Sequence, residues 1–450
     1  MSKVAVRKEL ILSEKLIIKG QNPTYGEVTI SGAKNSVLKL MAASLLCSDK
    51  CVIYNVPELS DVEIMLEVIG ELGVKSSYDK KLKKIEIDST NITNYTADKE
   101  YVSKMRASFC VLGALVGRLN IAKVALPGGC KIGERRVNLH IKGLEALGCE
   151  CETIDGYVIA KTNNLKGGVI CFDIPSVGAT ENVMMASVTA DGTTIIQNAA
   201  QEPEIVDLAN FLKSMGADIQ GAGTSEIVIK GVKQASLRGC EYTTLSDRIE
   251  AGTYMSIIVA SKGTGIIRNI FPNHLTLFTG KLLEMGANIK LLDPNTMMVS
   301  ADRRLKAMNF ITQPYPGFPT DLQALAMALL CCADGISVVT ESLYENRFMH
   351  IPELWKMGAN IIVNKKHAII KGVDYLVGTS VTSSDLRAGA ALVTAAVMAR
   401  GETEISALNH IDRGYENFVE KLRGLNIDAV RINNSLAQNT LTGGANGTKV

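Results

Sequence analysis

Cys130 stands in a setting that suits a reactive thiol. It lies in the stretch LPGGCKIGERRVNLH, residues 126–140, next to two glycines and close to Lys131, Arg135 and Arg136. Neighbouring cations favour the thiolate form of a cysteine, and a polar, glycine-rich turn keeps that thiol accessible. We therefore treat Cys130 as the candidate reactive cysteine of the chain.

Most of the other cysteines have a plainer interpretation. The chain has ten, and several lie in apolar segments, where a free cysteine packs as a small hydrophobe: Cys47, Cys110, Cys171, Cys331 and Cys332. The pairs Cys47 with Cys51 and Cys149 with Cys151 lack the further Cys or His ligands that a zinc site needs. We expect no structural metal and infer no cofactor.

Cationic residues recur at the expected starts of helices and in loops after strands. They comprise one lysine and six arginines: Lys34, Arg106, Arg135, Arg136, Arg347, Arg387 and Arg413. Helix N-termini carry partial positive charge and free N–H donors, so two groups of helix starts that face each other would bind anions. A single arginine could be a solvated surface charge, but seven cations at recurring places favour an anion site.

Acidic residues occur at similar places, and their roles stay open. Asp321 stands at a helix start, where an aspartate is an ordinary N-cap; a proton acceptor is the alternative. Asp247 and Asp385 have the same ambiguity, and we interpret them as caps. Glu202 and Glu204 could bind arginines across a cleft.

The chain repeats itself six times. In each repeat an amphipathic helix runs into a strand through a Leu/Met-Gly step or a variant of it, and the turn residues are 68 to 75 positions apart: Gly73, Gly148, Gly216, Gly286, Gly358 and Asn426. Glycine ends a helix in the left-handed conformation, and asparagine is the next most tolerant residue there. A helix that is apolar nearly all round recurs with the same period, at residues 35–47, 107–117, 181–192, 251–263, 322–335 and 388–401.

These repeats predict the fold class. An all-round apolar helix is buried on every side, so each repeat supplies one core helix, one surface helix and about four strands. We expect an α/β protein in which three repeats close around their core helices in each of two domains; a one-dimensional solenoid is the alternative. The expected domains are 34–244, and 1–33 together with 245–430, followed by a disordered tail at 431–450.

Composition limits the partners. The 450 residues exceed one usual hydrophobic core, and 48 basic against 46 acidic residues leave a net charge of +2. Such a balance gives no overall field for nucleic acid or a membrane surface. The first 20 residues lack the apolar core of a signal peptide, and no apolar run approaches the roughly 18 residues of a membrane span. We expect a cytoplasmic protein that acts on small molecules, without nucleic-acid or membrane partners.

Nine segments carry a resemblance to a known family: SGAKNS, KMRASF, LPGGCKIG, SVGATEN, EPEIVDLANFL, FPTDLQA, ENRFMH, TSSDLRAGAALV and HIDRGYE. In this order they resemble the UDP-N-acetylglucosamine 1-carboxyvinyltransferases, from about Leu16 to Val430. The resemblance implies a two-domain inside-out α/β barrel, shared with the shikimate-pathway enolpyruvyl transferase. It also implies transfer of enolpyruvyl from phosphoenolpyruvate to the 3-hydroxyl of UDP-N-acetylglucosamine with release of phosphate, the first committed step of peptidoglycan synthesis.

The same resemblance implies roles for individual residues. The implied catalytic residues are Cys130, which protonates C3 or adds to C2 of phosphoenolpyruvate, Asp321, which takes the proton of the sugar hydroxyl, and Lys34. Phosphoenolpyruvate is implied to bind Lys34, Asn35, Arg135, Arg387 and Arg413. UDP-N-acetylglucosamine is implied to bind Arg106, Arg135, Arg136, Val137, Asn138, Leu139, Ser176, Gly178, Asp321, Leu343 and Arg347. Both substrates are anionic, which suits seven cations.

The chain departs from the family pattern in the segment RRVNLH. Arg136 stands where members usually have proline, and Asn138 where they have aspartate. In the family this segment holds the uracil ring, so the departure leaves two alternatives open. One is a paralogue with altered nucleotide-sugar specificity, and the other is a regulatory relative with low turnover. Retention of Lys34, Cys130, Asp321 and Arg413 together favours catalysis.

Overall fold

The computed structural model describes residues 14–128, 133 and 137–432. Cys130, Arg135 and Arg136 lie outside the described residues, as do residues 433–450 of the expected tail. Arg431 and Ile432, which we placed in that tail, instead belong to the strand β24.

The described strands form six sheets of four, and in each sheet one outer strand runs parallel to its neighbour while the others are antiparallel. Three of these sheets belong to the first half of the molecule. Their strands, in spatial order, are β14 (Glu241–Thr243), β3 (Lys50–Tyr54), β5 (Lys84–Asp88) and β4 (Lys75–Asp79); β6 (Thr96–Ala97), β7 (Ile121–Ala125), β9 (Tyr157–Lys161) and β8 (Glu150–Ile154); β10 (Val169–Cys171), β11 (Thr193–Gln197), β13 (Glu226–Lys230) and β12 (Asp218–Gln220).

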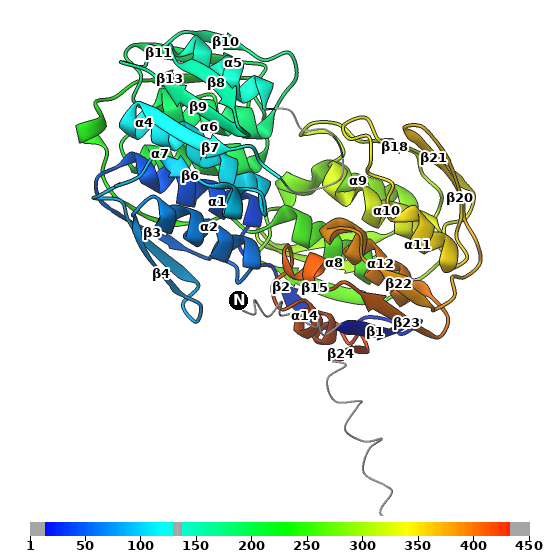
Figure 1. Ribbon diagram of the computed structural model, residues 1–450. Helices are drawn as coiled ribbons and strands as arrows, with labels where there is room; N and C mark the ends of the chain where they lie inside the picture. Colours follow the sequence, from blue (N-terminus) through cyan, green and yellow to red (C-terminus); the bar gives the residue numbers. More distant parts are fainter. Residues whose placement is uncertain (1–13, 129–132, 134–136, 433–450) are drawn as a thin grey trace, which may run out of the picture.

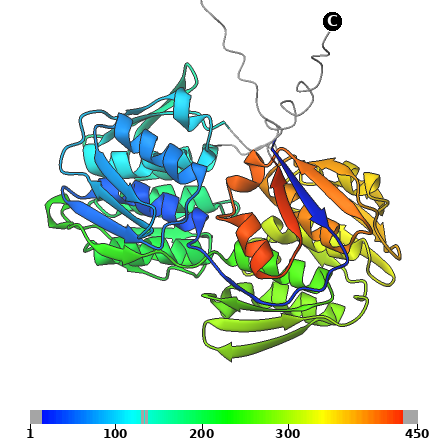
Figure 2. The same ribbon diagram turned by 90° about the horizontal axis from the view of Figure 1, so that it is seen from below.

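The second half repeats this order with strands from both ends of the chain. Its sheets are β2 (Glu27–Thr29), β15 (Thr264–Arg268), β17 (Thr296–Ser300) and β16 (Asn288–Asp293); β18 (Phe310–Ile311), β19 (Ile336–Thr340), β21 (His367–Lys371) and β20 (Asn360–Asn364); β22 (Ser380–Thr382), β23 (Glu402–Ser406), β1 (Lys15–Lys19) and β24 (Ala429–Ile432). Figure 2 shows β1 lying with the last strands of the chain.

Helices follow the predicted division into core and surface. The core helices are α1 (Lys34–Ala43), α4 (Val111–Leu119), α6 (Val177–Ser187), α8 (Arg248–Ala260), α10 (Gln323–Leu330) and α12 (Leu386–Met398). The surface helices are α2 (Ser60–Glu71), α5 (Asn138–Ala146), α7 (Pro203–Ser214), α9 (Thr276–Met285), α11 (Ile351–Lys356) and α14 (Phe418–Gly424). Short helices and 3₁₀ turns complete the described chain: α3 (Lys99–Val102), α13 (Asn409–Asp412), η1 (Ser44–Leu46), η2 (Arg106–Cys110), η3 (Gln234–Ser236), η4 (Pro272–Leu275) and η5 (Thr320–Leu322).

The six turns that mark the repeats all have the left-handed backbone that the sequence predicts. Their φ angles lie between 60° and 109°, at Gly73, Gly148, Gly216, Gly286, Gly358 and Asn426. The core helices contact one another within each half: α8, α10 and α12 in the second, and α4 with α1 and α6 in the first. The fold is therefore the expected inside-out α/β barrel of six repeats, with helices inside and sheets outside, and not a solenoid.

Two hydrophobic cores correspond to the two halves seen in Figure 1. One contains buried residues between 37 and 237, and the other combines residues 16–30 with residues 249–429. The chain crosses between the halves near residues 31–33 and 245–247, and the two crossings bond to each other. Ala33 N donates to Leu245 O at 2.8 Å, and Asp247 N donates to Ser31 O at 2.9 Å. The starts of α1 and α8, which follow these crossings, therefore lie where the halves meet.

Candidate active site

Asp321 is held by two arginines from different elements of the second half. Its Oδ1 accepts from Nη2 of Arg347 at 2.6 Å, and its Oδ2 accepts from Nη2 and Nε of Arg387 at 3.0 and 3.2 Å. The residue lies in η5, immediately before α10, and the N-cap residues of these two helices are Pro319 and Leu322. The N-cap interpretation of Asp321 is therefore wrong, whereas Asp247 and Asp385 cap α8 and α12 as expected.

Arg387 is buried beneath this carboxylate, with only 2% of its surface exposed. Its Nη1 donates to the hydroxyl of Tyr415 at 3.1 Å, and that hydroxyl also bonds Thr253 Oγ1 at 2.9 Å. Burial acts to lower the pKa of this guanidinium, but the charges of Tyr415 and Asp321 outweigh burial, so the pKa is raised. Arg387 is thus a fixed cation, and Tyr415 is a partner that sequence reasoning missed.

The second cluster spans both halves of the molecule. Asp61, in the first turn of α2, accepts from Lys34 Nζ at 3.2 Å through Oδ2 and from Arg413 Nε at 2.9 Å through Oδ1. Arg413 also donates from Nη2 to Lys104 O at 3.2 Å. Lys34 begins α1 and is 8% exposed, while Asp61 is 2% exposed. The structure thus brings together two predicted phosphoenolpyruvate ligands that are far apart in the sequence.

A buried ion pair lies between the core helices α1 and α6 of the first half. Lys39 Nζ contacts Glu181 Oε2 at 2.8 Å, and Cys110 Sγ donates to the same oxygen at 3.5 Å. Burial acts to lower the pKa of Lys39, but Glu181 outweighs burial and the pKa is raised. Sequence reasoning missed Lys39, although a lysine within the apolar stretch SVLKLMAA was a signal for a buried cation.

Five of the residues predicted to hold the nucleotide lie at the starts of two neighbouring helices. Val137, Asn138 and Leu139 open α5, and Ser176 and Gly178 open α6, where Ser176 Oγ accepts from Ala179 N at 3.4 Å. A Cβ at Gly178 would lie 3.0 Å from Cε1 of His140, so the two helix starts approach closely there. The geometry presents two helix N-termini side by side, an arrangement that favours anions.

His140 fixes the contact between these two helices. Its Nδ1 lies 2.7 Å from Nδ2 of Asn182 in α6, and its ring meets the edge of Phe109 at 5.1 Å between centroids. Burial, and then the charges of Arg106 and Lys39, lower the pKa of His140 to about 3. The imidazole is therefore neutral, and Arg106, which begins η2, lies near enough to act on it.

The remaining predicted residues lie around the same region. Asn35 follows Lys34 in α1, and Leu343 N donates to Oε1 of Glu341 at 2.9 Å in the loop that leads to Arg347. Gly133, the described residue next to the undescribed part of the Cys130 segment, packs against the side chain of Glu345 in the second half. Gly133 therefore lies against the half that carries Asp321.

Other predictions from the sequence have mixed outcomes. Glu204 does bind an arginine across the halves, since its Oε1 accepts from Arg248 Nε at 3.0 Å. Cys171, expected to pack as a small hydrophobe, is exposed on the outer strand β10, because β10 presents it on the solvent side.

Among the described residues no cluster of three or more His, Cys, Asp or Glu side chains could hold a metal ion. No described helix is long and apolar enough to cross a bilayer.

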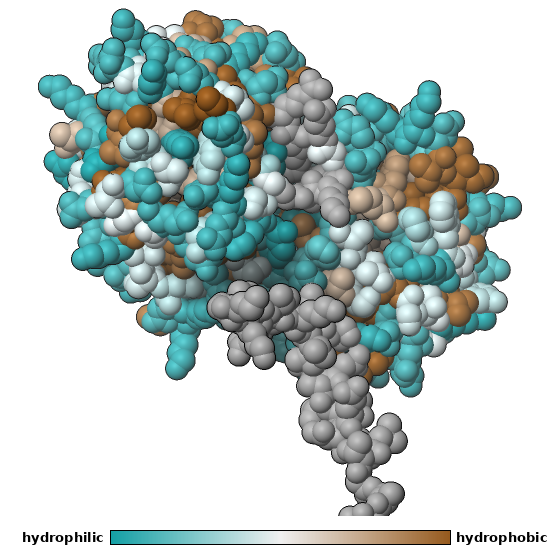
Figure 3. Space-filling view, viewed as in Figure 1, coloured by the Kyte–Doolittle hydropathy of each residue, from teal (hydrophilic) through white to brown (hydrophobic). Residues whose placement is uncertain are grey.

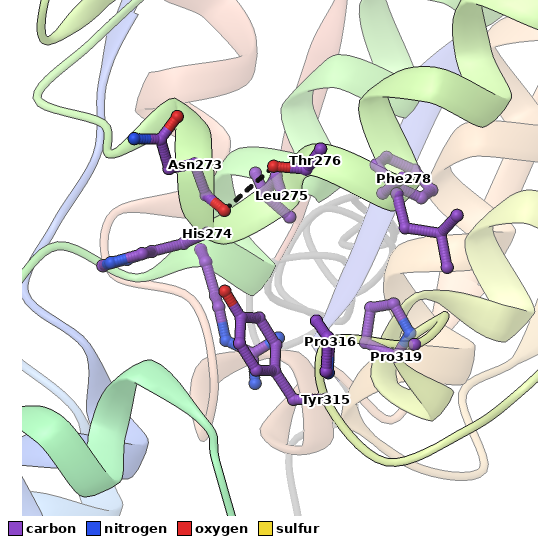
Figure 4. Close-up of a pocket in the computed structure, with 11 residues that line it drawn as sticks. Asn273, His274, Leu275, Thr276, Phe278, Tyr315, Pro316 and Pro319 are labelled. Atoms are coloured by element: carbon purple, nitrogen blue, oxygen red, sulfur yellow. Dashed lines mark hydrogen bonds between the residues drawn. The ribbon is translucent and has the colours of Figure 1, made fainter. Parts of the chain in front are cut away.

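The visible surface is hollowed where the two halves meet, and hydrophilic side chains line it there (Figure 3). A separate small cavity of about 50 Å³ lies in the second half, lined by Arg248, Asn273, His274, Phe278, Tyr315 and Pro319 among others. Figure 4 shows its lining side chains, including Thr276, whose Oγ1 donates to Asn273 O at 3.0 Å. None of the predicted site residues lines this cavity, and its volume has room for a few water molecules only.

Two barrels of three repeats meet at clusters of paired cationic and acidic side chains. The model of the EPSP synthase (3-phosphoshikimate 1-carboxyvinyltransferase) family matches residues 18–422. The solved structure of the enolpyruvyl transferase NikO from Streptomyces tendae has the same fold, with a TM-score of 0.83 at 24% identity over 93% of this chain and 99% of that one. The structure of EPSP synthase from Acinetobacter baumannii is also similar, with a TM-score of 0.69 at 18% identity over 93% of this chain and 100% of that one. The chain belongs to the enolpyruvyl transferase family.

Sequence relatives show to which group of enolpyruvyl transferases the chain is similar in sequence. The chain is 50% identical over 420 residues to UDP-N-acetylglucosamine 1-carboxyvinyltransferase 2 of Carboxydothermus hydrogenoformans, covering 93% of this chain and 99% of the relative. It is 48% identical over 414 residues to UDP-N-acetylglucosamine 1-carboxyvinyltransferase 1 of Caldanaerobacter subterraneus subsp. tengcongensis, covering 92% and 98%. Within the enolpyruvyl transferases, the chain belongs with the UDP-N-acetylglucosamine 1-carboxyvinyltransferases.

Proposed function

We propose that this protein transfers the enolpyruvyl group of phosphoenolpyruvate to the 3-hydroxyl of UDP-N-acetylglucosamine and releases phosphate. The observation that carries the proposal is the identity of 47 to 50% to proteins of that name over nearly their whole length. The reaction is the first committed step of peptidoglycan synthesis, so the protein acts in cell-wall biogenesis. We place it in the cytoplasm, where it meets two small-molecule substrates.

Asp321 is proposed as the proton acceptor for the sugar hydroxyl. The sugar oxygen bonds to C2 of phosphoenolpyruvate while C3 gains a proton, and the tetrahedral intermediate then loses phosphate from C2 and a proton from C3. Arg347 and Arg387 hold the Asp321 carboxylate from both sides at 2.6 and 3.0 Å, which fixes its direction. Its side chain keeps 29% of its surface exposed, so an oxygen remains within reach of a substrate.

The cations at the junction of the halves are proposed to hold phosphoenolpyruvate. Lys34 and Arg413 converge on Asp61 from opposite halves, and Arg387 lies behind Asp321. A guanidinium binds a carboxylate or phosphate with two parallel hydrogen bonds, while a lysine contributes a point charge. Asn35 and Arg135 complete the proposed set, and Cys130 is the proposed acid or nucleophile; Arg135 and Cys130 lie outside the described residues.

The paired starts of α5 and α6 are proposed to receive the nucleotide. Val137, Asn138 and Leu139 supply the wall next to the ring, and Ser176 and Gly178 open the facing helix. Arg106, Arg136, Leu343 and Arg347 are the other proposed contacts of the sugar nucleotide. The domain division proposed with this function is 34–244 against 1–33 with 245–430, because the two hydrophobic cores separate along it.

A phosphate-release assay tests the proposal. Phosphate should appear only when both substrates are present, and the product should gain the mass of the enolpyruvyl group. The paralogue alternative rests on Arg136 and Asn138, so calorimetric titration with uridine, cytidine and thymidine sugar nucleotides decides it. Binding that prefers a cytidine or thymidine nucleotide by tenfold, about 1.4 kcal/mol, would leave only the enolpyruvyl part of the proposal. Tight binding without phosphate release would identify the regulatory relative.

A further inference from the structure

One short loop of the second half contacts both the anion-binding side chains and the first half. Residues 413–416 follow α13, and three of the four make long-range contacts. Arg413 donates to Asp61 of the first half at 2.9 Å, and Tyr415 accepts from Arg387 at 3.1 Å. Glu416 also contacts residues of the first half. The placement of two site residues therefore depends on how this loop is anchored.

Glu416 is anchored by donors from three separate segments. It is 3% exposed. Its Oε1 accepts from the backbone N of Glu58 at 2.8 Å, and its Oε2 accepts from Lys83 Nζ at 2.6 Å and from Ser31 Oγ at 2.5 Å. Burial acts to raise its pKa, but these hydrogen bonds, that of Lys83 first, outweigh burial and lower it. The buried group is therefore a carboxylate that needs a cation.

Lys83 supplies that cation from the surface of the first half. It belongs to the turn between β4 and β5, where its backbone has a φ of 49° and its carbonyl accepts from Val56 N at 2.9 Å. Its side chain remains 44% exposed. A cavity of about 400 Å³ opens beside the ion pair and is lined by Ser31, Asn55, Lys83, Glu416 and Lys421 among others. Water and salt therefore have access to the lysine, whereas the side chain of Glu416 is only 2% exposed.

We propose that Lys83 and Glu416 form a latch between the two halves, and that both are positioning residues for phosphoenolpyruvate binding. The inference rests on the proposed function, because Arg413 is assigned to that substrate there. Glu416 is three residues from Arg413. Glu58, whose backbone N donates a hydrogen bond to Glu416, is three residues from Asp61. The latch therefore fixes the same two segments whose side chains meet at the Arg413–Asp61 contact.

Removal of the Lys83 charge should weaken this arrangement. A buried carboxylate that loses its cation gains by moving toward water, and separation of the halves is the movement that exposes Glu416. Arg413 would then leave Asp61 and Lys34. Saturating phosphoenolpyruvate would restore the arrangement, so the defect should appear in KM and not in kcat. Because Lys83 is partly exposed, the effect of removing its charge should lie between the effects of breaking a surface ion pair and a buried ion pair.

The chain offers a matched control in the next residue. Lys84 is also a lysine of this hairpin, but its Nζ contacts Glu86 of the same half at 2.8 Å. We expect Lys83→Met to raise the KM for phosphoenolpyruvate about tenfold with kcat within twofold, and Lys84→Met to change neither. Added salt should raise the wild-type KM by a larger factor than the Lys83→Met KM, because salt screens the exposed Lys83 in addition to the substrate charges that both enzymes share. Equal KM values for the two variants would overturn the latch.

Two further measurements separate a latch from a general loss of stability. Glu416→Gln should raise the same KM, and the double variant with Lys83→Met should be no worse than the larger single effect, because both remove one interaction. Small-angle scattering of the enzyme without substrates should give a larger radius of gyration for Lys83→Met than for wild type or Lys84→Met. An unchanged radius, or additive KM effects, would refute the latch. If the wild type releases no phosphate, the proposed function fails, while the scattering comparison still decides the latch.

Discussion

The substitution Asp321→Asn tests the role of the carboxylate that two arginines hold. A general base contributes roughly 10²- to 10⁴-fold to turnover, which is about 2.7 to 5.5 kcal/mol of transition-state stabilisation. The amide can still accept a hydrogen bond from one guanidinium, but it presents Nδ2 to the other. Arg347 keeps its bond to Thr320 O at 3.3 Å, and Arg387 keeps its bond to Tyr415 at 3.1 Å. Substrate binding should therefore stay within a few-fold of wild type.

Loss of one charge-assisted hydrogen bond also has a cost in stability. Such a bond contributes about 1.5 to 3 kcal/mol, which should lower the melting temperature by roughly 3 to 12 °C for one half of the molecule. Initial rates of phosphate release, calorimetric titration with the sugar nucleotide and thermal melts separate the two effects. Asp374→Asn is the control, because it breaks an exposed ion pair with Arg304 in the same half. A lower melting temperature at unchanged turnover would refute the role as base and leave Asp321 as a structural clamp.

Three further outcomes are expected. Small anionic epoxides should alkylate Cys130 first, and faster with the sugar nucleotide present; mass mapping that finds exposed Cys171 labelled first would contradict this. Arg413→Lys should raise the KM for phosphoenolpyruvate about tenfold, because a lysine offers a single ammonium where the guanidinium presents separate nitrogens to Asp61 and to Lys104 O; an unchanged KM would remove Arg413 from that site. His140, buried and neutral with a pKa of about 3, makes no pH-dependent contribution above its unfolded pKa of about 6.5. Below that, the unfolded chain binds a proton that the folded chain does not. The free energy of unfolding should therefore fall by about 1.4 kcal/mol per pH unit down to about pH 3, and His140→Gln should remove this fall in denaturant titrations at pH 5 and 7. If wild type and His140→Gln lose the same free energy of unfolding between pH 7 and pH 5, the titrating group is not His140.

The repeat pattern made the fold predictable because each repeat carries its own local signals. An all-round apolar helix and a glycine or asparagine at a positive φ recur in every unit. The seams between repeats have no such signal. β14 pairs with β3, and β1 lies between β23 and β24, so these sheets close with strands from distant parts of the chain. Strand pairing of that kind depends on how the barrel closes, which the residues of one repeat do not encode.

The site was predictable to the extent that its residues have unusual types for their places. Arg387 at the start of an apolar helix, and Lys39 inside one, both require a buried partner. Asp61 carries no such mark, because an aspartate in the first turn of a surface helix is an ordinary partner of the helix dipole. Its role depends on Lys34 and Arg413 converging on it from two halves. Contacts between halves arise from the docking of two barrels and not from local sequence.

The two acids at the junction have a common consequence for catalysis. Asp61 lies between Lys34 and Arg413, and Asp321 lies between Arg347 and Arg387, so each carboxylate lies between two cations that would otherwise repel each other. An anionic substrate that binds Arg387 must share that guanidinium with Asp321, which weakens the interaction that stabilises the charged carboxylate. On the proposed function, the anionic substrate and the proposed base Asp321 therefore compete for the same guanidinium.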